Sequence, residues 1–566
     1  MRKGFLIFSI LIITFATKSF PQVQSSDEKL REIVRNYGQA KVSIPYLDLK
    51  STDLITRNVS ILSVKEKKIN ISLSPLTIDW FLSQKFEYSI LPESDSKGLI
   101  SALNLNQAMA WETYPTFTQY DSIMRSFVSL YPTLCRLDTI GKSINGKLVM
   151  ALKISDNVSV NEDEPEVFYT STIHGDETGG FILMLRLSDY LLKNYQTSTR
   201  IKNMVDNLEI WINPLANPDG TYRTGNTMSS PTRYNANGVD LNRNFPDPSQ
   251  INMVQQKENT DMITFMKKHR FVISANFHAG AEVFNYPWDR YLSKYHADDA
   301  WFYTLGREYA DTVHVYSSPA YMNMYDNGVV RGAVWYVITG GRQDYVTYEL
   351  QGREVTIELD DIHVTPAAQL SLLWQNNYRS LLNYLENGLY GISGKVLNSV
   401  TSAPVEAKVF IAGHDKDSSH VYSDPVSGSF TRLISPGSWN VTFSAKGYKD
   451  TTVNNIIVYS GQRTDLSVNL KPIVNSIDST LPSPLIIYPN PASREIKVKF
   501  PDSLAGLLNV KIYRQDGIII SDYIIEAEPN INLPIDISKL ASGVYSVILT
   551  HSKTKVSSRG LFVVIK

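Results

Sequence analysis

The stretch EVFYTSTIHGDE, residues 166–177, decides the fold expected for the largest part of the chain. Its first eight residues are mostly apolar, β-branched or aromatic, which predicts a buried strand that leads into a helix at residues 177–194. Further strands are expected at residues 208–212, 271–277 and 355–359, and further helices at residues 261–269 and 366–386. Such alternation predicts an α/β fold in which helices cover a mixed sheet.

Two residues at the end of this first strand, His174 and Glu177, have a spacing that lets an imidazole and a carboxylate reach one metal ion. Taken alone, such a pair is more often a solvated His near a helix start. A third candidate, His278, ends another apolar strand, FVISANFH. Two His and one Glu at the carboxyl ends of strands, with a fourth position left for water, predict a hydrolytic zinc centre rather than a calcium or magnesium site.

Hydrolysis of an amide also needs a base that takes the proton of the attacking water. Glu358, in the strand VTIEL, is the candidate for this base. The alternative is a surface carboxylate on an edge strand. Because its neighbours are apolar, the fold would bury this charge without a partner unless Glu358 faces a site.

Six motifs appear in order along the chain: HGDE, then NPDG at residues 217–220, RYNANGVDLNRNFP at 233–246, NFH with YPWD at 276–289, WYVITGG at 335–341 and TIEL at 356–359. In these motifs, residues 112–388 resemble the zinc metallocarboxypeptidases of the carboxypeptidase A, B, D and E type, the funnelins. The resemblance implies an eight-stranded mixed sheet, one zinc ion per catalytic domain, and hydrolysis of the C-terminal bond of a peptide or protein.

The resemblance also assigns roles to residues outside the metal site. Asn242 and Arg243 would hold the free C-terminal carboxylate of the substrate, since a guanidinium binds a carboxylate through two hydrogen bonds. Arg233 would stabilise the oxyanion that develops on the scissile carbonyl. Tyr336 would close over the bound substrate.

Two positions bear on which substrate is cut. Asp176 replaces the Arg or Asn that these enzymes carry between the zinc ligands, so contacts further along the peptide are expected to differ. Gln343 stands where the digestive members of the family carry the residue at the bottom of the side-chain pocket. Asp289 follows the Y-P-aromatic motif, where the regulatory members carry a selecting acid. A buried acid there would favour a C-terminal Lys or Arg. The alternative is that Asp289 pairs with Arg290 or another local base and selects nothing.

The chain is also expected to carry segments on both sides of the enzyme. In residues 1–21, Arg2 and Lys3 precede an apolar run too short to span a bilayer, which predicts a secretory signal peptide rather than a buried strand. Residues 27–109 predict a propeptide-like or accessory α+β domain, with helices at 28–36 and 76–84 and strands at 59–64 and 69–73.

The segments after the enzyme are β-rich. Residues 391–470 resemble a transthyretin-like or carboxypeptidase-regulatory-like β-sandwich, and residues 471–484 form a linker. Residues 485–566, with YPNPA, IYRQDG and LASGVYSV, resemble the C-terminal sorting domain read by the type IX secretion machinery of certain Gram-negative bacteria. The alternative is an Ig-like sandwich with no sorting role.

Composition limits the partners and the compartment. The chain has 55 Lys and Arg and 56 Asp and Glu, and it lacks a long basic block, so we expect no nucleic-acid partner. No transmembrane anchor is expected. The single cysteine, Cys135, allows no intramolecular disulfide, which suits a bacterial protein exported through the periplasm to the surface or the medium.

Two other functions remain open at this point. A related zinc peptidase could act on bacterial cell-wall peptides, which also end in a carboxylate. A catalytically inactive binding protein could use its β-sandwiches alone, although the intact His174, Glu177, His278 and Glu358 argue against it.

Overall fold

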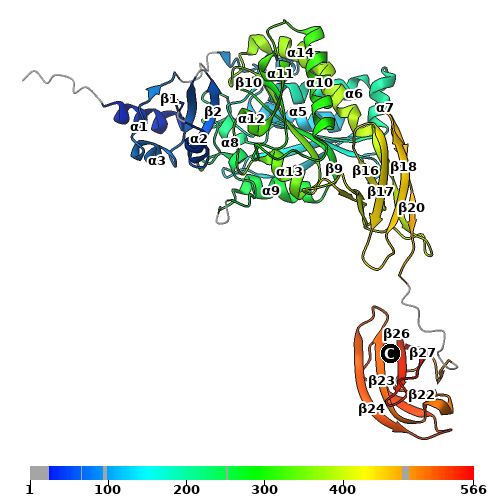
Figure 1. Ribbon diagram of the computed structural model, residues 1–566. Coiled ribbons are helices and arrows are strands. Elements are labelled where there is room, and N and C mark those ends of the chain that lie inside the picture. Colours follow the sequence, from blue (N-terminus) through cyan, green and yellow to red (C-terminus); the bar gives the residue numbers. More distant parts are fainter. Residues whose placement is uncertain (1–24, 47, 66, 93–97, 250–252, 474–483) are drawn as a thin grey trace, which may run out of the picture. The chain divides into compact units, whose positions relative to one another are not determined.

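The computed structural model describes residues 25–46, 48–65, 67–92, 98–249, 253–473 and 484–566 (Figure 1). Its contacts divide the chain into two compact units, residues 1–472 and 473–566. The expected signal peptide and most of the expected linker lie outside the described residues. Within the described part of the chain, no helix is both long enough and apolar enough to cross a membrane.

The N-terminal part of the first unit is a small four-stranded sheet with helices packed on it. Its elements are α1 (Ser26–Tyr37), β1 (Ala40–Pro45), α2 (Leu49–Thr56), β2 (Ser60–Lys65), β3 (Lys68–Leu73), α3 (Ile78–Ser83) and β4 (Ser89–Ile90). The strand order is β2-β3-β1-β4. The expected helices and strands match α1, α3, β2 and β3 within a few residues, whereas β1 and α2 were not predicted from the sequence.

An eight-stranded mixed sheet covered by helices forms the centre of the first unit, as the resemblance implied. Its strands are β5 (Cys135–Lys142), β6 (Leu148–Ile154), β7 (Glu166–Ser171), β8 (Glu209–Asn213), β9 (Phe271–His278), β10 (Ala281–Tyr286), β11 (Val329–Arg331) and β12 (Arg353–Asp360). Its helices include α4 (Leu105–Ala108), α5 (Phe117–Leu130), α6 (Gly179–Asn194), α7 (Thr199–Val205), α8 (Pro218–Thr221), α9 (Lys257–Lys267), α10 (Asp299–Tyr316), α11 (Met324–Asn327), α12 (Gly332–Trp335), α13 (Arg342–Glu349) and α14 (Leu370–Glu386).

The order β11-β10-β12-β9-β7-β8-β6-β5 places the parallel strands at the middle of this sheet. Strand β9 pairs in parallel with β12 on one side and with β7 on the other. Alternate residues of β7 serve opposite faces: Val167 and Tyr169 join the core under α6 and α14, and Phe168 joins the core under α9. Because helices cover both faces, these strands are buried over almost their whole length.

The first unit ends in a β-rich domain that continues directly from the enzyme-like part. Its strands are β13 (Gly391–Asn398), β14 (Lys408–Ile411), β15 (Val421–Tyr422), β16 (Ser429–Arg432), β17 (Gly437–Ser444), β18 (Thr451–Val458), β19 (Arg463–Asp465) and β20 (Val468–Leu470). One sheet has the order β16-β13-β19, with β20 also pairing with β13, and the other has the order β15-β14-β17-β18. The two sheets share one apolar core.

The second unit is a separate β domain with its own core. Its strands are β21 (Ile486–Tyr488), β22 (Glu495–Lys499), β23 (Gly506–Arg514), β24 (Ile519–Ala527), β25 (Leu533–Asp536), β26 (Gly543–His551) and β27 (Ser557–Val564). They form sheets of order β21-β22-β25 and β24-β23-β26-β27.

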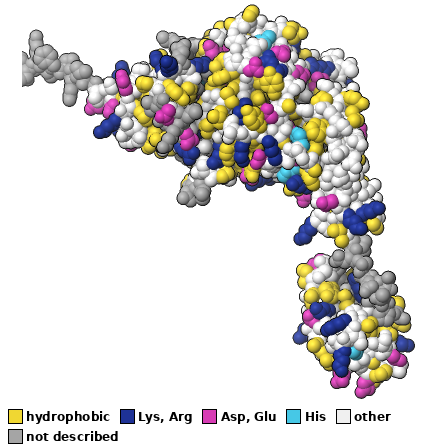
Figure 2. Space-filling model, in the orientation of Figure 1, with side chains coloured by type: hydrophobic (Ala, Val, Ile, Leu, Met, Phe, Trp, Pro, Cys, Tyr) yellow, Lys and Arg dark blue, Asp and Glu magenta, His cyan; other side chains and the backbone are white. Residues whose placement is uncertain are grey.

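Acidic and basic side chains are interspersed over the face shown in Figure 2, in line with the net charge of −1 for the whole chain.

Candidate active site

The three predicted metal ligands converge at the carboxyl ends of two neighbouring parallel strands. His174 and Glu177 follow β7, and His278 is the last residue of β9. Nδ1 of His174 lies 2.8 Å from Oε1 of Glu177, and Nδ1 of His278 lies 2.7 Å from Oε2 of the same carboxylate. All three side chains are buried. Three donor atoms of the types that zinc prefers therefore surround one point.

The close approach of the two imidazoles fits a metal between them. Their Nδ1 atoms are 3.1 Å apart, and tetrahedral zinc with bonds of about 2.0–2.1 Å to nitrogen places two ligand nitrogens about 3.3 Å apart. The outward ring nitrogens are held as well: Asp240 Oδ1 lies 3.0 Å from Nε2 of His174, and the amide oxygen of Asn276 contacts Nε2 of His278. Metal-binding histidines are oriented in this way by acceptors on their second nitrogen.

The backbone around the HGDE motif explains its glycine. A side chain at Gly175 would lie 2.4 Å from the carbonyl carbon of Gly220, so the motif can pack against the NPDG turn only without one. Just before the motif, Thr172 has a φ of 62°, which is costly for a β-branched residue. Such strain at a strand end is typical of functional sites.

The predicted base lies beside the metal site. Glu358 of β12 pairs in register with His278 of β9. Its Oε2 atom is buried and has no hydrogen-bond partner among the described residues. Burial and the neighbouring charge of Glu177 raise the pKa of the Glu358 carboxyl well above its ordinary value. Glu358 therefore lies in the same cavity as the metal ligands, with one carboxylate oxygen unpaired among the described residues.

Three cationic or polar residues of the motif at residues 233–246 enter the same cavity. Arg233 donates to Asp240 at 2.9 Å and lies 3.3 Å from Oε1 of Glu177. Burial would lower the pKa of Arg233, but these two carboxylates raise it, so the guanidinium stays charged. Nε and Nη2 of Arg243 are buried without a hydrogen-bond partner within the described chain. Together with Asn242, which also lines the cavity, Arg243 can accept an anionic ligand.

Asp289 forms the acidic wall of this cavity and is only 4% exposed. Its Oδ1 atom accepts hydrogen bonds from Gln343 Nε2 at 2.9 Å and from Asn285 Nδ2 at 3.0 Å. A side chain at Gly332 would lie 1.8 Å from this oxygen, so the glycine leaves room for the carboxylate. Asp289 and Gln343 are thus in direct contact.

The alternative partner of Asp289 lies elsewhere. The guanidinium of Arg290 pairs with Asp247, and the backbone N–H groups of Asp289 and Arg290 donate to the two oxygens of Asp344. Burial raises the pKa of Asp289 to about 6. Burial and the charge of Asp289 raise the pKa of Asp344 well above its ordinary value. Among the described residues, Arg290 therefore does not neutralise Asp289, and the cation whose charge acts on this acid is Arg243 in the same cavity, which opposes the effect of burial.

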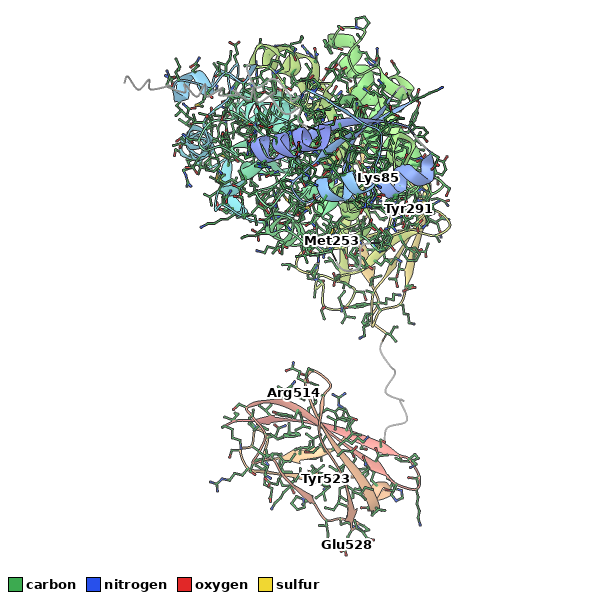
Figure 3. The ribbon with its side chains drawn as sticks, turned by 90° about the vertical axis from the view of Figure 1, so that its left-hand side faces the viewer. Lys85, Met253, Tyr291, Arg514, Tyr523 and Glu528 are labelled. Atoms are coloured by element: carbon green, nitrogen blue, oxygen red, sulfur yellow. The ribbon has the colours of Figure 1, made fainter. Side chains whose placement is uncertain are left out.

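The N-terminal domain covers this cavity. Ile61 and Leu62 of β2 line it together with the metal ligands, and only about 20 Å³ remains inside. The Tyr336 hydroxyl donates to the carbonyl oxygen of Ile61 at 3.4 Å, and Ser60 donates to Asp240 at 2.6 Å. Figure 3 shows the helices of the N-terminal domain in front of the enzyme-like part.

Several residues of the site were not singled out from the sequence. Three of them lie within or beside the quoted motifs and hold other site residues in place. Asp240 and Asn276 contact the two histidine ligands, and Asn285 contacts Asp289. A signal was present at Asp240, which precedes a short helical turn and accepts from the backbone N–H of Asn242 at 2.9 Å. The sequence gave no indication that β2 covers the cavity, because β2 belongs to another domain than the zinc ligands.

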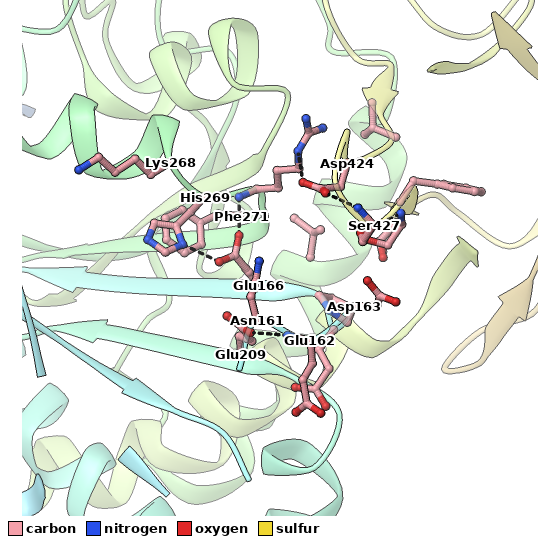
Figure 4. Close-up of a pocket in the computed structure, with 18 of the residues that line it drawn as sticks. Asn161, Glu162, Asp163, Glu166, Glu209, Lys268, His269, Phe271, Asp424 and Ser427 are labelled. Carbon is pink, nitrogen blue, oxygen red and sulfur yellow. Dashed lines mark hydrogen bonds and ion pairs between the residues drawn. The ribbon is translucent and has the colours of Figure 1, made fainter. Parts of the chain in front are cut away.

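A larger cavity of about 420 Å³ lies away from these residues, between the eight-stranded sheet and the β13–β20 domain (Figure 4). Some of its charged side chains pair with one another, whereas Oε2 of Glu162 and Oε2 of Glu164 are buried without a hydrogen-bond partner among the described residues. Glu209 pairs with Lys153 at 2.7 Å, and Glu166 lies 2.5 Å from His269. This cavity is larger than the one at the metal ligands, but the convergent ligands of the types that zinc prefers mark the smaller one as the active site.

Comparison with known proteins agrees with this geometry. Residues 120–380 match the family model described as zinc carboxypeptidase. Carboxypeptidase D of Homo sapiens is 34% identical over 379 residues, which cover 64% of this chain and 27% of that protein. The carboxypeptidase N catalytic chain of Mus musculus is 31% identical over 378 residues, which cover 59% of this chain and 82% of that protein.

This chain belongs to the zinc carboxypeptidase family. It spans about a quarter of the length of carboxypeptidase D, since the match covers 27% of that protein. Its His174, Glu177 and His278 form the zinc site of a zinc carboxypeptidase.

The two C-terminal β domains also match family models. Residues 391–471 match the carboxypeptidase regulatory-like domain, and residues 486–564 match the secretion system C-terminal sorting domain. Both resemblances drawn from the sequence are confirmed. The sorting domain indicates export to the cell surface or the exterior.

Proposed function

We propose that this chain is an exported zinc carboxypeptidase that releases single Lys or Arg residues from the C-termini of peptides or proteins. The observation that carries the proposal is the buried carboxylate of Asp289, which does not pair with the neighbouring Arg290, in the same cavity as the zinc ligands, Glu358 and Arg243. A cationic side chain would compensate this charge, whereas an apolar one would leave it buried and unpaired.

The residues of this chain would divide the reaction among them. Asn242 and Arg243 bind the α-carboxylate and so fix the substrate by its end. Zinc, when bound by its three ligands, polarises the scissile carbonyl and lowers the pKa of a water to about 7. Glu358 takes the proton of the attacking water and returns it to the leaving amine. Arg233 stabilises the negative charge that develops on the carbonyl oxygen.

The test is amino-acid release from two matched blocked peptides, one ending in Arg and one in Phe. The full chain is assayed with and without a zinc chelator, and the Glu358→Gln variant serves as the control. Each assay is run before and after a brief trypsin treatment, and trypsin is inhibited before the peptide is added. The proposal expects chelator-sensitive release of Arg. Release of Phe alone would contradict the role of Asp289, and release of neither would favour a cell-wall peptide as the substrate.

The cover over the cavity supports a second part of this proposal. The N-terminal domain acts as a propeptide that keeps the enzyme latent, because about 20 Å³ does not admit a peptide terminus. Trypsin treatment in the assay above is then expected to raise the rate of release. An intact chain as active as the treated one would contradict latency.

The C-terminal domain would direct export. Its match to a sorting domain supports passage through the periplasm of a Gram-negative bacterium and recognition by the type IX secretion machinery. The catalytic residues lie in the first unit, so export and catalysis would be separable.

A further inference from the structure

A row of buried polar side chains runs along one face of β9 and β12 toward the zinc ligands. Three pairs of residues lie opposite each other in these two strands: Ser274 with Glu354, Asn276 with Thr356, and His278 with Glu358. The residues between them, among them Phe277 and Ile357, belong to the apolar core on the other face. The row therefore joins a buried charged residue, Glu354, to the zinc ligand His278.

Glu354 is held at one end of this row as a carboxylate. Arg342, the first residue of α13, places Nε 2.9 Å from Oε1 of Glu354 and donates from Nη2 to Oε2 at 3.0 Å. The same Oε2 atom accepts from Oγ of Ser274 at 2.8 Å. Burial raises the pKa of Glu354, and the charge of Arg342 opposes this effect. Because these partners all donate, Glu354 serves them as an acceptor without a proton of its own.

Glu354 determines which way the side-chain amide of Asn276 points. Its Oε1 atom accepts from Nδ2 of Asn276 at 3.2 Å, and the carbonyl oxygen of Val355 accepts from the same nitrogen at 3.1 Å. The hydroxyl of Thr356, 3.1 Å from Nδ2, can accept or donate and does not discriminate. With the amide turned over, its oxygen would face the other two acceptors, of which the charged one forms the stronger hydrogen bond. The amide oxygen, Oδ1, therefore faces Nε2 of His278.

The amide oxygen of Asn276 decides which ring nitrogen of His278 carries the proton. Because this oxygen can only accept, Nε2 of His278 carries the hydrogen and Nδ1 keeps its electron pair. Nδ1 is the nitrogen that lies 2.7 Å from Oε2 of Glu177 and 3.1 Å from Nδ1 of His174, the other two ligands. At His174 a carboxylate, Asp240, contacts the outward nitrogen directly. At His278 the carboxylate acts at one remove, through an amide.

We propose that Glu354 is a positioning residue for the metal: acting through Asn276, it keeps the ring proton of His278 on Nε2 and so leaves Nδ1 free to bind zinc. Arg342 compensates the charge of Glu354 in this buried place. This role goes beyond the proposed function, because it concerns the zinc site itself and holds whichever residue the enzyme releases. Loss of an outer hydrogen-bond partner of this kind typically weakens metal binding by about 10–100-fold.

The first test measures the zinc affinity of the full chain at equilibrium, by competition with a chelator of known affinity. Glu354→Gln offers an N–H group where Asn276 also donates, so the dissociation constant for zinc should rise by about tenfold or more. The matched control is Glu209→Gln. It changes an equally buried carboxylate on β8 of the same sheet, which pairs with Lys153 at 2.7 Å, and should leave zinc affinity unchanged. An equal loss of affinity in both variants would overturn the proposal.

A second variant keeps the test decisive if Glu354→Gln does not fold. Glu354→Met combined with Arg342→Met removes both buried charges at similar volume, a change that is often neutral for stability. We expect this variant to keep its fold, as measured by circular dichroism, and to bind zinc about tenfold or more weakly, because Asn276 has lost its charged acceptor. A folded double variant that binds zinc as tightly as the unchanged chain would overturn the proposal.

The third measurement observes the ring proton of His278. The zinc-loaded full chain with isotope-labelled histidines is studied by NMR, and the signal of His278 is identified by its loss in His278→Ala. We expect the Nε2–H proton to exchange slowly with water in the unchanged chain and in Glu209→Gln. It should exchange faster in Glu354→Gln, because the acceptor on Asn276 is no longer fixed. An Nε2–H signal with the same exchange rate in Glu354→Gln would overturn the relay through Asn276.

Discussion

Glu358 Oε2, Arg243 Nε and Arg243 Nη2 are buried atoms without hydrogen-bond partners among the described residues. Leaving a buried polar group unsatisfied costs about 1–3 kcal/mol, and more for a charged group. Glu358 and Arg243 both line the cavity that also contains the zinc ligands. At the scale of residues, the unpaired atoms of Glu358 and Arg243 are therefore available to the polar groups of a bound substrate.

The base gives the first prediction. Glu358→Gln keeps the size of the side chain but removes its ability to take a proton, so kcat should fall by about 10²–10⁴-fold while the zinc content stays the same. Steady-state kinetics and metal analysis on the same samples check this. The control is Glu349→Gln, which changes an exposed carboxylate at the end of α13. A variant with near-normal kcat would show that another group takes the proton.

The second prediction concerns pH and Asp289. Because the pKa of this carboxyl is raised to about 6 by burial, it is charged above pH 6 and takes up a proton as the pH falls through that value. The preference for terminal Arg over Leu, as a ratio of kcat/KM, should therefore be largest near pH 7.5 and shrink toward pH 5. In Asp289→Asn the ratio should be lower by about 10–100-fold at pH 7.5 and independent of pH. A pH-dependent ratio that persists in this variant would assign selectivity to another group.

At the scale of elements, the sequence was sufficient where apolar patterns and motifs coincide. The sequence predicted strands β7, β9 and β12, because helices cover both faces of these strands. Since His278 and Glu358 stand toward the carboxyl ends of such strands, the sequence also predicted that the two residues lie close together. Strand β1 was missed although its apolar residues alternate. Lys41 and Ser43 on its other face resemble a solvated surface, and only the docked enzyme domain buries them. Contacts between domains leave no periodic signal in a single strand.

The junction between β12 and the β13–β20 domain gives an element-scale prediction. Asp298 is fully buried between Arg353 of β12 and Arg432 of β16, at 2.7 and 2.9 Å. Arg432→Ala leaves Asp298 with Arg353 alone and removes the guanidinium that also pairs with Asp415, so it should lower the free energy of unfolding by about 3–5 kcal/mol. Chemical denaturation measures it, with Arg463→Ala as the control. Arg463 pairs only at the surface with Asp465 and should change stability by about 0.5 kcal/mol or less. Equal effects of the two variants would contradict a structural role for Asp298.

At the scale of the whole molecule, the chain combines a cover, an enzyme, a fused β-sandwich and a separate sorting unit. The motifs predicted the enzyme and both C-terminal domains because their residues are contiguous. The position of β2 over the cavity could not be predicted, because it depends on how two domains dock. The sequence therefore predicted the chemistry of the site better than its accessibility.

The separation of the two units gives a prediction for export. A chain that ends at Pro472 keeps the first unit and should retain peptide hydrolysis after trypsin treatment, but it should accumulate in the periplasm. Cell fractionation and activity assays check both parts. Normal export of the shortened chain would contradict the role of the sorting domain, and loss of hydrolysis would show that the second unit supports catalysis.

The central claim is that zinc at His174, Glu177 and His278 serves the release of a single residue from a free C-terminus. The most direct measurement is mass spectrometry of one peptide that ends in Arg and is prepared both as the free acid and as the amide. Each form is incubated with the trypsin-treated chain after trypsin inhibition, once with zinc and once without it. The account predicts loss of one Arg from the acid only, and only with zinc, because Asn242 and Arg243 bind the carboxylate. Cleavage of the amide at a similar rate, cuts within the peptide, or release that persists without metal would contradict it.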